Sequence, residues 1–326
     1  MVRIRQRWSL VLLGLVLGMG FVACKKDGTA GSGDKSSEAS GGGPGGDLAL
    51  LPADSEVVFG MNLGQMQQSA LWKQFVEPRL ATGEGHQMMD EFKAKCGIDP
   101  LKMISSLTVG ARGFPDNPSG VAVVHGVDKA KLLDCLDKHK DELAKQGGEV
   151  TRDGDVVLVK SDRNEPVAVQ FTSDSTAVIV AGPNASAAAV KAVLGGSSSL
   201  KSSAPFLEMY KKVKTGDSIW GLASGKVLDR MPLGLKITAA YGSINVTDGL
   251  AVDSRVRFDK PEAATQAAEM ANAQTKQFTP QYVDKAEATA EGDELHVSVA
   301  VSGQKLPGLI PILMMAAAAM RGMGGN

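Results

Sequence analysis

An internal repeat constrains the fold of this chain of 326 residues more than any other feature of its sequence. Segment 58–66, VFGMNLGQM, aligns with segment 219–227, IWGLASGKV. Both have a branched residue, an aromatic residue, glycine and an apolar residue, and a second glycine follows the first after four positions. Each copy then has an apolar segment that opens a predicted strand, at 120–123 and at 249–252, and an Asp-Lys pair follows before a helical pattern. We therefore expect two related halves.

Each copy also contains a predicted hairpin after the helix. Residues 149–160 and 285–302 place strand-forming segments on both sides of the turns Asp153-Gly154-Asp155 and Glu291-Gly292-Asp293. Asp128 is a suitable N-cap for the helix of the first copy. Helices and antiparallel strands in this order predict an α+β fold, made of two related repeats of antiparallel strands with flanking helices.

The predicted boundaries follow from the same pattern. We expect the first repeat over residues 48–196 and the second over 205–326. Between them, residues 195–204 read GGSSSLKSSA, which has the composition of a linker. The first repeat carries additional predicted helices, a long one over 66–95 and an alanine-rich one over 185–194.

The second repeat ends in an uncharged segment, Leu306–Met320, with prolines near its start. It is shorter than the roughly 20 apolar residues of a transmembrane helix. Two interpretations remain open. The segment is either an apolar terminal helix packed on a sheet, or a surface that contacts a membrane or a partner protein.

Residues 1–23 have the organisation of an export signal. Arg3, Arg5 and Arg7 form a basic start without an acidic residue, and Ser9–Phe21 carries no charge. An apolar stretch of about 7–15 residues behind a basic start is typical of a secretory signal peptide. We therefore expect residues 1–23 to be removed on export.

The residues Phe21-Val22-Ala23-Cys24 resemble the lipobox of bacterial lipoproteins, although Phe21 stands where that motif usually has leucine. The resemblance implies cleavage before Cys24, a diacylglycerol thioether on its sulfur and usually a third acyl chain on its amine. Because each buried CH₂ contributes about 0.8 kcal/mol, such chains would hold the protein on a membrane. The alternative is a plain secretory signal with an unmodified Cys24, which would leave the protein unanchored.

Residues 24–47 are predicted to be the lipidated cysteine and a flexible linker. The segment is rich in glycine and serine and has no apolar pattern, so ordering it would not repay its entropy cost. Its typical reach is about 25 Å. In the lipoproteins that this start resembles, aspartate after the lipidated cysteine retains the protein in the inner membrane. Lys25 occupies that position, so the resemblance implies the cell envelope, at the outer membrane.

The start of the region after the linker carries a second resemblance. Residues 51–60, LPADSEVVFG, followed by SALW at 69–72, resemble the beginning of the mature part of envelope lipoproteins of myxobacteria and related bacteria. This resemblance implies neither an activity nor site residues.

The two other cysteines predict a disulfide. Cys96 ends one predicted helix and Cys135 lies within another, and an even pair is expected to be oxidised in an exported protein. A bridge that closes about 40 residues would stabilise the fold by roughly 4 kcal/mol in the chain-entropy treatment. The alternative is two unpaired thiols. The cysteines are not spaced as Cys-x-x-Cys, which argues against a redox centre.

The sequence lacks a recognisable catalytic or metal-binding motif. The four histidines, His86, His125, His139 and His296, are not at metal-ligand spacing. Ser224 lies one position too late for a nucleophile elbow, and its alignment in the repeat predicts a strand end. We therefore predict no enzyme, no cofactor and no metal. A net charge of −1 argues against a nucleic-acid partner.

Three functional hypotheses remain. The first is a lipid-anchored, non-enzymatic envelope protein that binds another protein or supports the envelope, with the membrane as a partner through Cys24. The second is a lipoprotein that binds a small, hydrophobic ligand between the two repeats, which an apolar cleft would favour. The third is a hydrolase whose site is assembled from scattered residues, which an ionisable group with a perturbed pKa in a cleft would favour.

Overall fold

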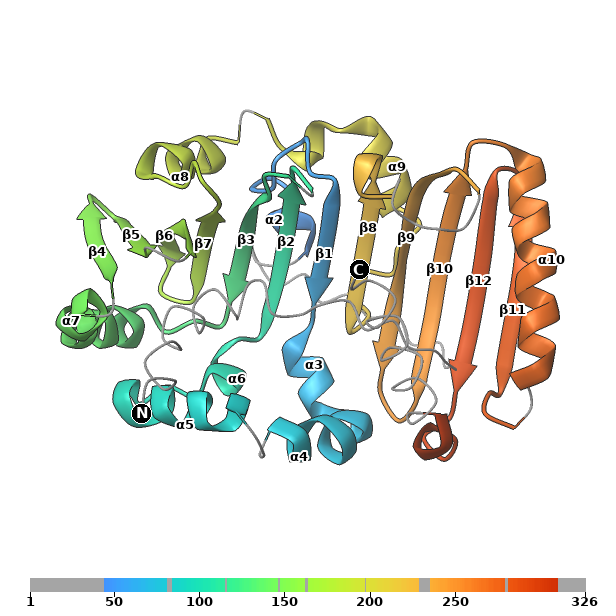
Figure 1. Cartoon of the computed structure of the whole chain (residues 1–326), viewed down its shortest axis with the longest axis horizontal. Helices are drawn as coiled ribbons and strands as arrows, with labels where there is room; N and C mark the ends of the chain where they lie inside the picture. Colours follow the sequence, from blue (N-terminus) through green and yellow to red (C-terminus); the bar gives the residue numbers. More distant parts are fainter. Residues whose placement is uncertain are drawn as a thin grey trace. The chain divides into compact units, whose positions relative to one another are not determined.

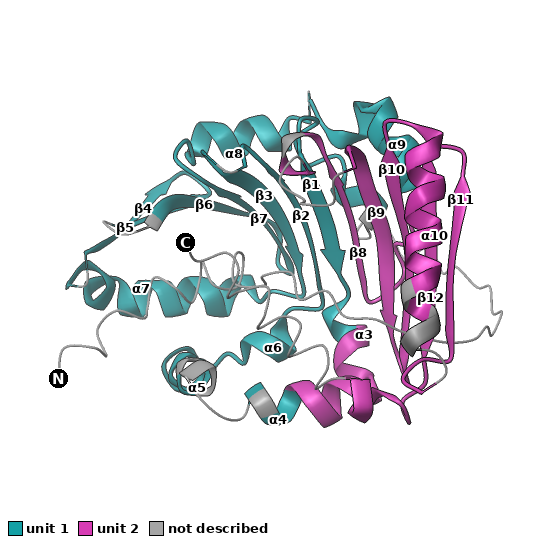
Figure 2. Ribbon diagram, turned by 45° about the vertical axis from the view of Figure 1, so that its right-hand side comes forward, with its two compact units in different colours: residues 1–19, 39–64, 77–211 teal, residues 20–38, 65–76, 212–326 magenta. Residues whose placement is uncertain are grey.

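The computed structural model describes residues 44–80, 84–114, 116–145, 147–161, 164–196, 198–228, 235–278 and 281–309. The predicted signal peptide, Cys24 and residues beyond 309 lie outside this part of the chain. The described residues fall into two compact units (Figure 2). Unit 1 comprises those of Ala39–Gly64 and Glu77–Lys211, and unit 2 comprises those of Gln65–Val76 and Lys212–Asn326. Both units are mixtures of helices and antiparallel strands, so the predicted α+β class is confirmed.

Within the described residues, the strands of unit 1 follow the order β1-β2-β3-β7-β6-β5-β4, and all neighbours are antiparallel (Figure 1). Their bounds are β1 Val57–Met61, β2 Ser106–Arg112, β3 Ser119–His125, β4 Gly148–Asp153, β5 Val156–Ser161, β6 Asn164–Ser173 and β7 Thr176–Ala181. The strands are rich in valine, a β-branched residue that packs well on a pleated surface.

The helices of unit 1 are α2 Pro44–Asp47, α4 Glu77–Leu80, α5 Glu84–Cys96, α6 Pro100–Met103, α7 Lys129–Lys145, α8 Ala187–Leu194, the 3₁₀ turn η3 Leu200–Ser202 and α9 Ala204–Tyr210. Helix α8 packs on β5, β6 and β7 through a cluster that includes Val156, Ala168 and Val190. Ser186 caps this helix, because its hydroxyl accepts a hydrogen bond from the Ala189 backbone N–H at 3.2 Å.

The predicted disulfide between Cys96 and Cys135 is confirmed. It joins the last residue of α5 to the middle of α7, with the two Cα atoms 5.0 Å apart, as disulfide geometry requires. An ion pair between Lys95 and Glu142, 2.8 Å apart, links the same two helices. Burial opposes the charged form of Lys95, but its hydrogen bonds to Glu142 and Glu91 raise the pKa of the ammonium group. The two helices are therefore held together both covalently and electrostatically.

Unit 2 has the strand order β11-β12-β10-β9-β8 within the described residues, again antiparallel throughout. Its elements are the π-helix η2 Trp72–Val76, β8 Ile219–Ser224, η4 Gly225–Leu228, β9 Ile237–Val246, β10 Leu250–Phe258, α10 Pro261–Phe278, β11 Lys285–Glu291 and β12 Glu294–Val301. Helix α3, Leu63–Gln68, spans the boundary between the units.

Helix α10 covers one face of β10, β12 and β11 (Figure 1). Its buried side consists of alanines, with Ala264 and Ala268 packed against Phe258 and Leu295. The Asn272 side chain accepts a hydrogen bond from the backbone N–H of Ala288 in β11 and donates one to the carbonyl oxygen of the same residue. Small side chains therefore let the helix lie close to the sheet, and Asn272 fixes its position along β11.

The two units share part of their strand order, but the predicted match of their hairpins is wrong. In each unit, three antiparallel strands precede a long helix, and the second strand of the last hairpin pairs with the third strand of the unit. These pairs are β3 with β7 and β10 with β12. The hairpin β11–β12 therefore corresponds to β6–β7, and not to residues 149–160. Hairpin β4–β5 is an addition to unit 1 at the edge of its sheet. A common origin of the two units stays a prediction.

The local turn and cap predictions are confirmed. Gly154 and Gly292 lie between the paired strands of their hairpins with φ angles of +62° and +65°, which glycine adopts without strain. Asp128 caps α7, because its carboxylate accepts a hydrogen bond from the Lys131 backbone N–H at 3.0 Å. Short polar side chains and glycine determine these positions locally, which is why the sequence reveals them.

Both predicted linkers differ from the structure at their ends. Residues 44–47 of the expected flexible segment form α2, and the side chain of Asp47 is buried. In the expected linker 195–204, Leu200 is buried, and its backbone N–H donates to the carbonyl oxygen of Leu51 at 2.9 Å. These segments pack on unit 1 because each contains a buried side chain, Asp47 in the first and Leu200 in the second.

The other expected boundaries also shift. Residues 205–211 group with unit 1, whereas Gln65–Val76 groups with unit 2. The single helix expected over 66–95 is divided into shorter helices. Of the apolar C-terminal segment, the structure describes residues up to Leu309, which is buried in a cluster with Val301 and Leu306. Among the described helices, none combines the length and the apolar character that crossing a bilayer requires.

The disulfide should be a main source of stability in unit 1. Replacing both Cys96 and Cys135 with serine should lower the free energy of unfolding by about 4 kcal/mol, because the bridge closes a separation of 39 residues. Urea unfolding of both proteins with and without reductant measures the difference. Reduction should bring the parent protein to the stability of the variant, and equal stabilities without reductant would contradict the prediction.

Candidate functional site

A groove of about 530 Å³ lies within unit 1. Helix α8 contributes Ala189 and Val193 to one side, and the segment after α2 contributes Leu50 and Pro52 to another. Val180 of β7 lies in the lining between them. The volume is within the range of about 300–1,000 Å³ that is typical of sites for small ligands. The groove is therefore the candidate binding site of this unit.

Small residues of the sheet make room for the groove. Gly110 in β2 and Gly120 in β3 both line it. A Cβ atom at Gly110 would lie 2.7 Å from the Ser55 hydroxyl oxygen and 3.3 Å from Cβ of Leu51. Glycine therefore lets the segment after α2 lie directly against β2, and this close approach determines where one wall of the groove stands.

The charged side chains that line the groove are Arg112 and Asp54. Arg112 ends β2, and its Nη1 atom donates to Oδ2 of Asp54. The two side chains are 47% and 64% exposed, so water screens the pair, and such pairs contribute about 0–1 kcal/mol. The groove therefore combines apolar walls with one weakly held ion pair.

A second polar cluster surrounds Asp47, at the end of α2. Its carboxylate accepts a hydrogen bond from the Thr108 hydroxyl at 2.7 Å and lies 3.0 Å from Nε2 of His125. Nδ1 of His125 lies 3.3 Å from the Thr176 hydroxyl oxygen. A hydroxyl, an imidazole and a carboxylate that contact one another in this order are also the parts of a catalytic triad. Here the carboxylate is buried with a second hydroxyl partner, and none of these residues lines the groove, so the cluster serves to hold α2 on the sheet.

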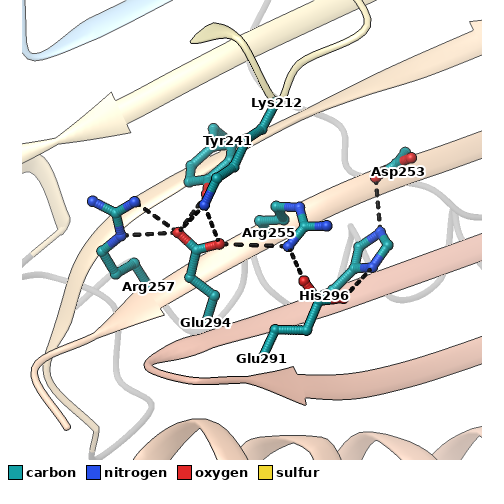
Figure 3. A network of polar contacts seen from close by, with 8 residues as sticks. All are labelled: Lys212, Tyr241, Asp253, Arg255, Arg257, Glu291, Glu294 and His296. Atoms are coloured by element: carbon teal, nitrogen blue, oxygen red, sulfur yellow. Dashed lines mark hydrogen bonds and ion pairs between the residues drawn. The ribbon is translucent and has the colours of Figure 1, made fainter. Parts of the chain in front are cut away.

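Unit 2 contains a buried carboxylate with several partners (Figure 3). Glu294 is 3% exposed at the start of β12. It accepts hydrogen bonds from Lys212 at 2.9 Å, from Arg257 at 2.7 Å and from the Tyr241 hydroxyl at 2.5 Å. Arg257 is the cross-strand neighbour of Glu294 in the β10–β12 pair. The register of two strands therefore brings the opposite charges together.

The network continues along the same face of β10. Arg255 donates to Glu291 at 2.6 Å, and His296 lies 3.3 Å from Glu291 and 3.0 Å from Asp253. Lys214 pairs with Asp253 at 2.7 Å. Since side chains alternate across a strand, residues 253, 255 and 257 share the face opposite the one that α10 covers.

The charges of the network are strongly stabilised. Burial by itself would raise the pKa of Glu294, but hydrogen bonds from Tyr241, Lys212 and Arg257 outweigh this effect and lower the pKa to about 2. Burial and the bond to Glu294 raise the pKa of the Tyr241 hydroxyl well above its usual range. Glu294 is therefore ionised and Tyr241 is neutral near pH 7. Neither group has a pKa close to 7, as a group that exchanges protons at this pH would need.

The other residues from the sequence analysis are dispersed. Ser224 ends β8, as predicted, and is not part of a nucleophile elbow. His139 lies in α7, 3.4 Å from Glu142, and His86 belongs to α5. Cys24 lies outside the described residues. In the part of the chain that the structure describes, no three His, Cys, Asp or Glu side chains are grouped as metal ligands.

The comparisons with known proteins bear on the fold alone. No protein-family model matches the chain, and no curated protein is significantly similar to it. Crystal form III of TP0453 is similar, with a TM-score of 0.50 and 11% sequence identity over 81% of this chain and 96% of that chain. Crystal form IV of TP0453 gives a TM-score of 0.50 and 10% identity over 81% and 95%. This similarity indicates a shared α+β fold.

The sequence analysis missed both the groove and the network. The alternation of Asp253, Arg255 and Arg257 in a predicted strand was a usable signal, because it places three charges on one face. Glu294 and His296 show the same spacing. The groove had no comparable signal, since its lining comes from distant segments and consists mostly of alanine, glycine and valine.

The Glu294 network should dominate the polar contribution to the stability of unit 2. Glu294→Gln should lower the free energy of unfolding by roughly 3 kcal/mol at pH 7, because it leaves the partly buried Arg255 and Arg257 without their buried counter-charge. Glu287→Gln is the matched control, since Glu287 is exposed and its ion pair within the described residues is the one with Lys285. It should cost at most about 1 kcal/mol. Urea unfolding monitored by circular dichroism measures both.

The pH dependence provides a second test of the same variant. The folded-state pKa of Glu294 is lowered from 4.5 to about 2, so its stabilising effect is present above about pH 4.5 and lost as the pH falls towards 2. The stability difference between wild type and Glu294→Gln should therefore shrink over this interval. A difference that stays constant from pH 6 to pH 2 would contradict the assigned role of the carboxylate.

Proposed function

We propose that this chain is a lipid-anchored, non-enzymatic binding protein of the bacterial cell envelope. The observation that carries the proposal is the order of features along the N-terminal region. An export-signal pattern and Cys24 precede a glycine- and serine-rich segment, and α2 and the groove wall follow. A membrane anchor joined to a domain with a binding groove accounts for this order. The outer membrane and a protein partner in the envelope belong to the same proposal.

The chemistry of the two polar clusters supports binding over catalysis. Glu294 and Asp47 are buried carboxylates whose partners lie on neighbouring elements of their own unit. Neither lines the groove. A hydrolase needs an ionisable group that contacts the substrate with a pKa near the working pH. The groove instead offers one exposed ion pair and apolar walls.

Lipidation of Cys24 is tested by expressing the full chain and a Cys24→Ala variant in a Gram-negative host. The wild-type protein should lose residues 1–23, gain the mass of two or three acyl chains and remain with the membrane fraction. The variant should lack the acyl mass. Intact-mass spectrometry and fractionation measure both properties, and a soluble wild-type protein without acyl mass would disprove the anchor.

A second candidate function is the binding of a small apolar ligand. The sequence analysis placed such a site between the two repeats. The groove that favours this function lies wholly within unit 1, between α8 and the segment after α2. Its walls of alanine, valine, leucine and proline would contribute through the burial of apolar surface.

A long-chain alcohol is a suitable probe, because it needs only the apolar walls. Dodecanol should bind to the wild-type groove, and Ala189→Trp should abolish binding by filling it. Ala188→Trp is the matched control, since Ala188 is exposed on the same helix and does not line the groove. Displacement of a fluorescent apolar dye measures binding, and equal effects of the two substitutions would place the site elsewhere.

A further inference from the structure

We propose that the groove of unit 1 binds a long-chain carboxylate, with the aliphatic chain between α8 and the segment after α2 and the carboxylate on Arg112. The inference rests on the proposed ligand-binding function of the groove and adds the class of ligand. It follows from the chemistry of the lining, which combines apolar side chains with the guanidinium group of Arg112.

The lining favours an aliphatic chain over a polar molecule. Leu50, Pro52, Val121, Val180 and Val193 contribute apolar surface to the groove. A polar ligand placed against these side chains would lose hydrogen bonds to water without replacing them. An aliphatic chain loses none and gains from leaving water. The body of the ligand should therefore be hydrocarbon.

Arg112 is suited to hold the head group. Its guanidinium group has five N–H donors in a planar fork, which matches the geometry of a carboxylate. Its hydrogen bond to Asp54 is donated by Nη1. Because both side chains are about half exposed, at 47% and 64%, this pair is weak and can rearrange when a ligand arrives. A ligand carboxylate can then share or replace Asp54 as the partner of Arg112.

The charge of the lining also limits the ligand class. Arg112 and Asp54 are the charged side chains of the groove, and they neutralise each other. The remaining polar lining residues, Ser119, Asn184 and Ser198, are neutral. A phosphate with two negative charges would meet one arginine that already faces an aspartate. Asp54 repels a head group with a single negative charge less than a phosphate, and a carboxylate can place both oxygens on the guanidinium of Arg112.

The test compares two probes of equal chain length, dodecanoate and dodecanol, at pH 8 and below their aggregation concentrations. The protein is the mature chain, residues 24–326, with Cys24→Ala to remove the acyl chains. Dodecanoate should bind about tenfold more tightly than dodecanol, as a charge-assisted hydrogen-bonded pair implies. Isothermal calorimetry measures both affinities, and circular dichroism confirms that each variant is folded.

Three variants and one control assign the binding of the two probes to particular residues. Arg112→Met should weaken the binding of dodecanoate about tenfold and leave that of dodecanol unchanged, because it removes the cation and keeps an unbranched apolar side chain. Asp54→Asn should strengthen dodecanoate alone, since it removes the competing carboxylate. Ala189→Trp should abolish the binding of both probes, whereas Ala188→Trp should change neither.

Each other result has a distinct meaning. Equal affinities of the two probes, with no effect of Arg112→Met, would overturn the carboxylate assignment and leave the apolar groove in place. Absence of binding by both probes would overturn the ligand-binding function as well. Binding by the Cys24→Ala protein but not by the acylated protein would mean that the chain's own acyl group occupies the groove, which also overturns the proposal.

Discussion

The buried carboxylate of Asp47 attaches α2 to the sheet of unit 1, and one wall of the groove depends on it. Hydrogen bonding to Thr108 and the contact with His125 hold the end of α2 on strands β2 and β3. Leu48 and Leu51, which follow Asp47 in the chain, are both buried, so apolar packing continues the attachment that the polar contact begins. Without this attachment, the segment that forms one wall of the groove would lose its polar contacts with β2 and β3 at its start and would be held by its apolar burial and its backbone bond to Leu200.

Local chemistry explains what the sequence could predict. The turns at Gly154 and Gly292 and the cap at Asp128 depend on residues within a few positions, and the structure has all three. The disulfide was predictable because Cys96 and Cys135 were the cysteines left for an even pair. The wrong hairpin match had a different cause. Strand pairing is a long-range property, and two hairpins with similar turns cannot be told apart by their turn residues.

Unit 2 shows how a sheet can separate two kinds of packing. On one face, the alanines of α10 lie against Phe258 and Leu295. On the other, alternate residues of β10 and β12 carry the charges that meet around Glu294 (Figure 3). Which face a charge occupies was readable from the alternation, but the identity of its partner was not. The pair of Glu294 with Arg257 depends on the register between β10 and β12, and the sequence of one strand does not contain it.

The position of α2 has a mechanical consequence. A pull on the chain that precedes Asp47 reaches Thr108 and His125 first, on two adjacent strands. Next in line is the backbone contact between Leu51 and Leu200, which fastens the same wall of the groove. These bonds would break one after another, since the load falls on each in turn. Tension on the N-terminal segment would therefore detach this wall of the groove from the end nearest to Asp47, before the strand pairs of the sheet separate.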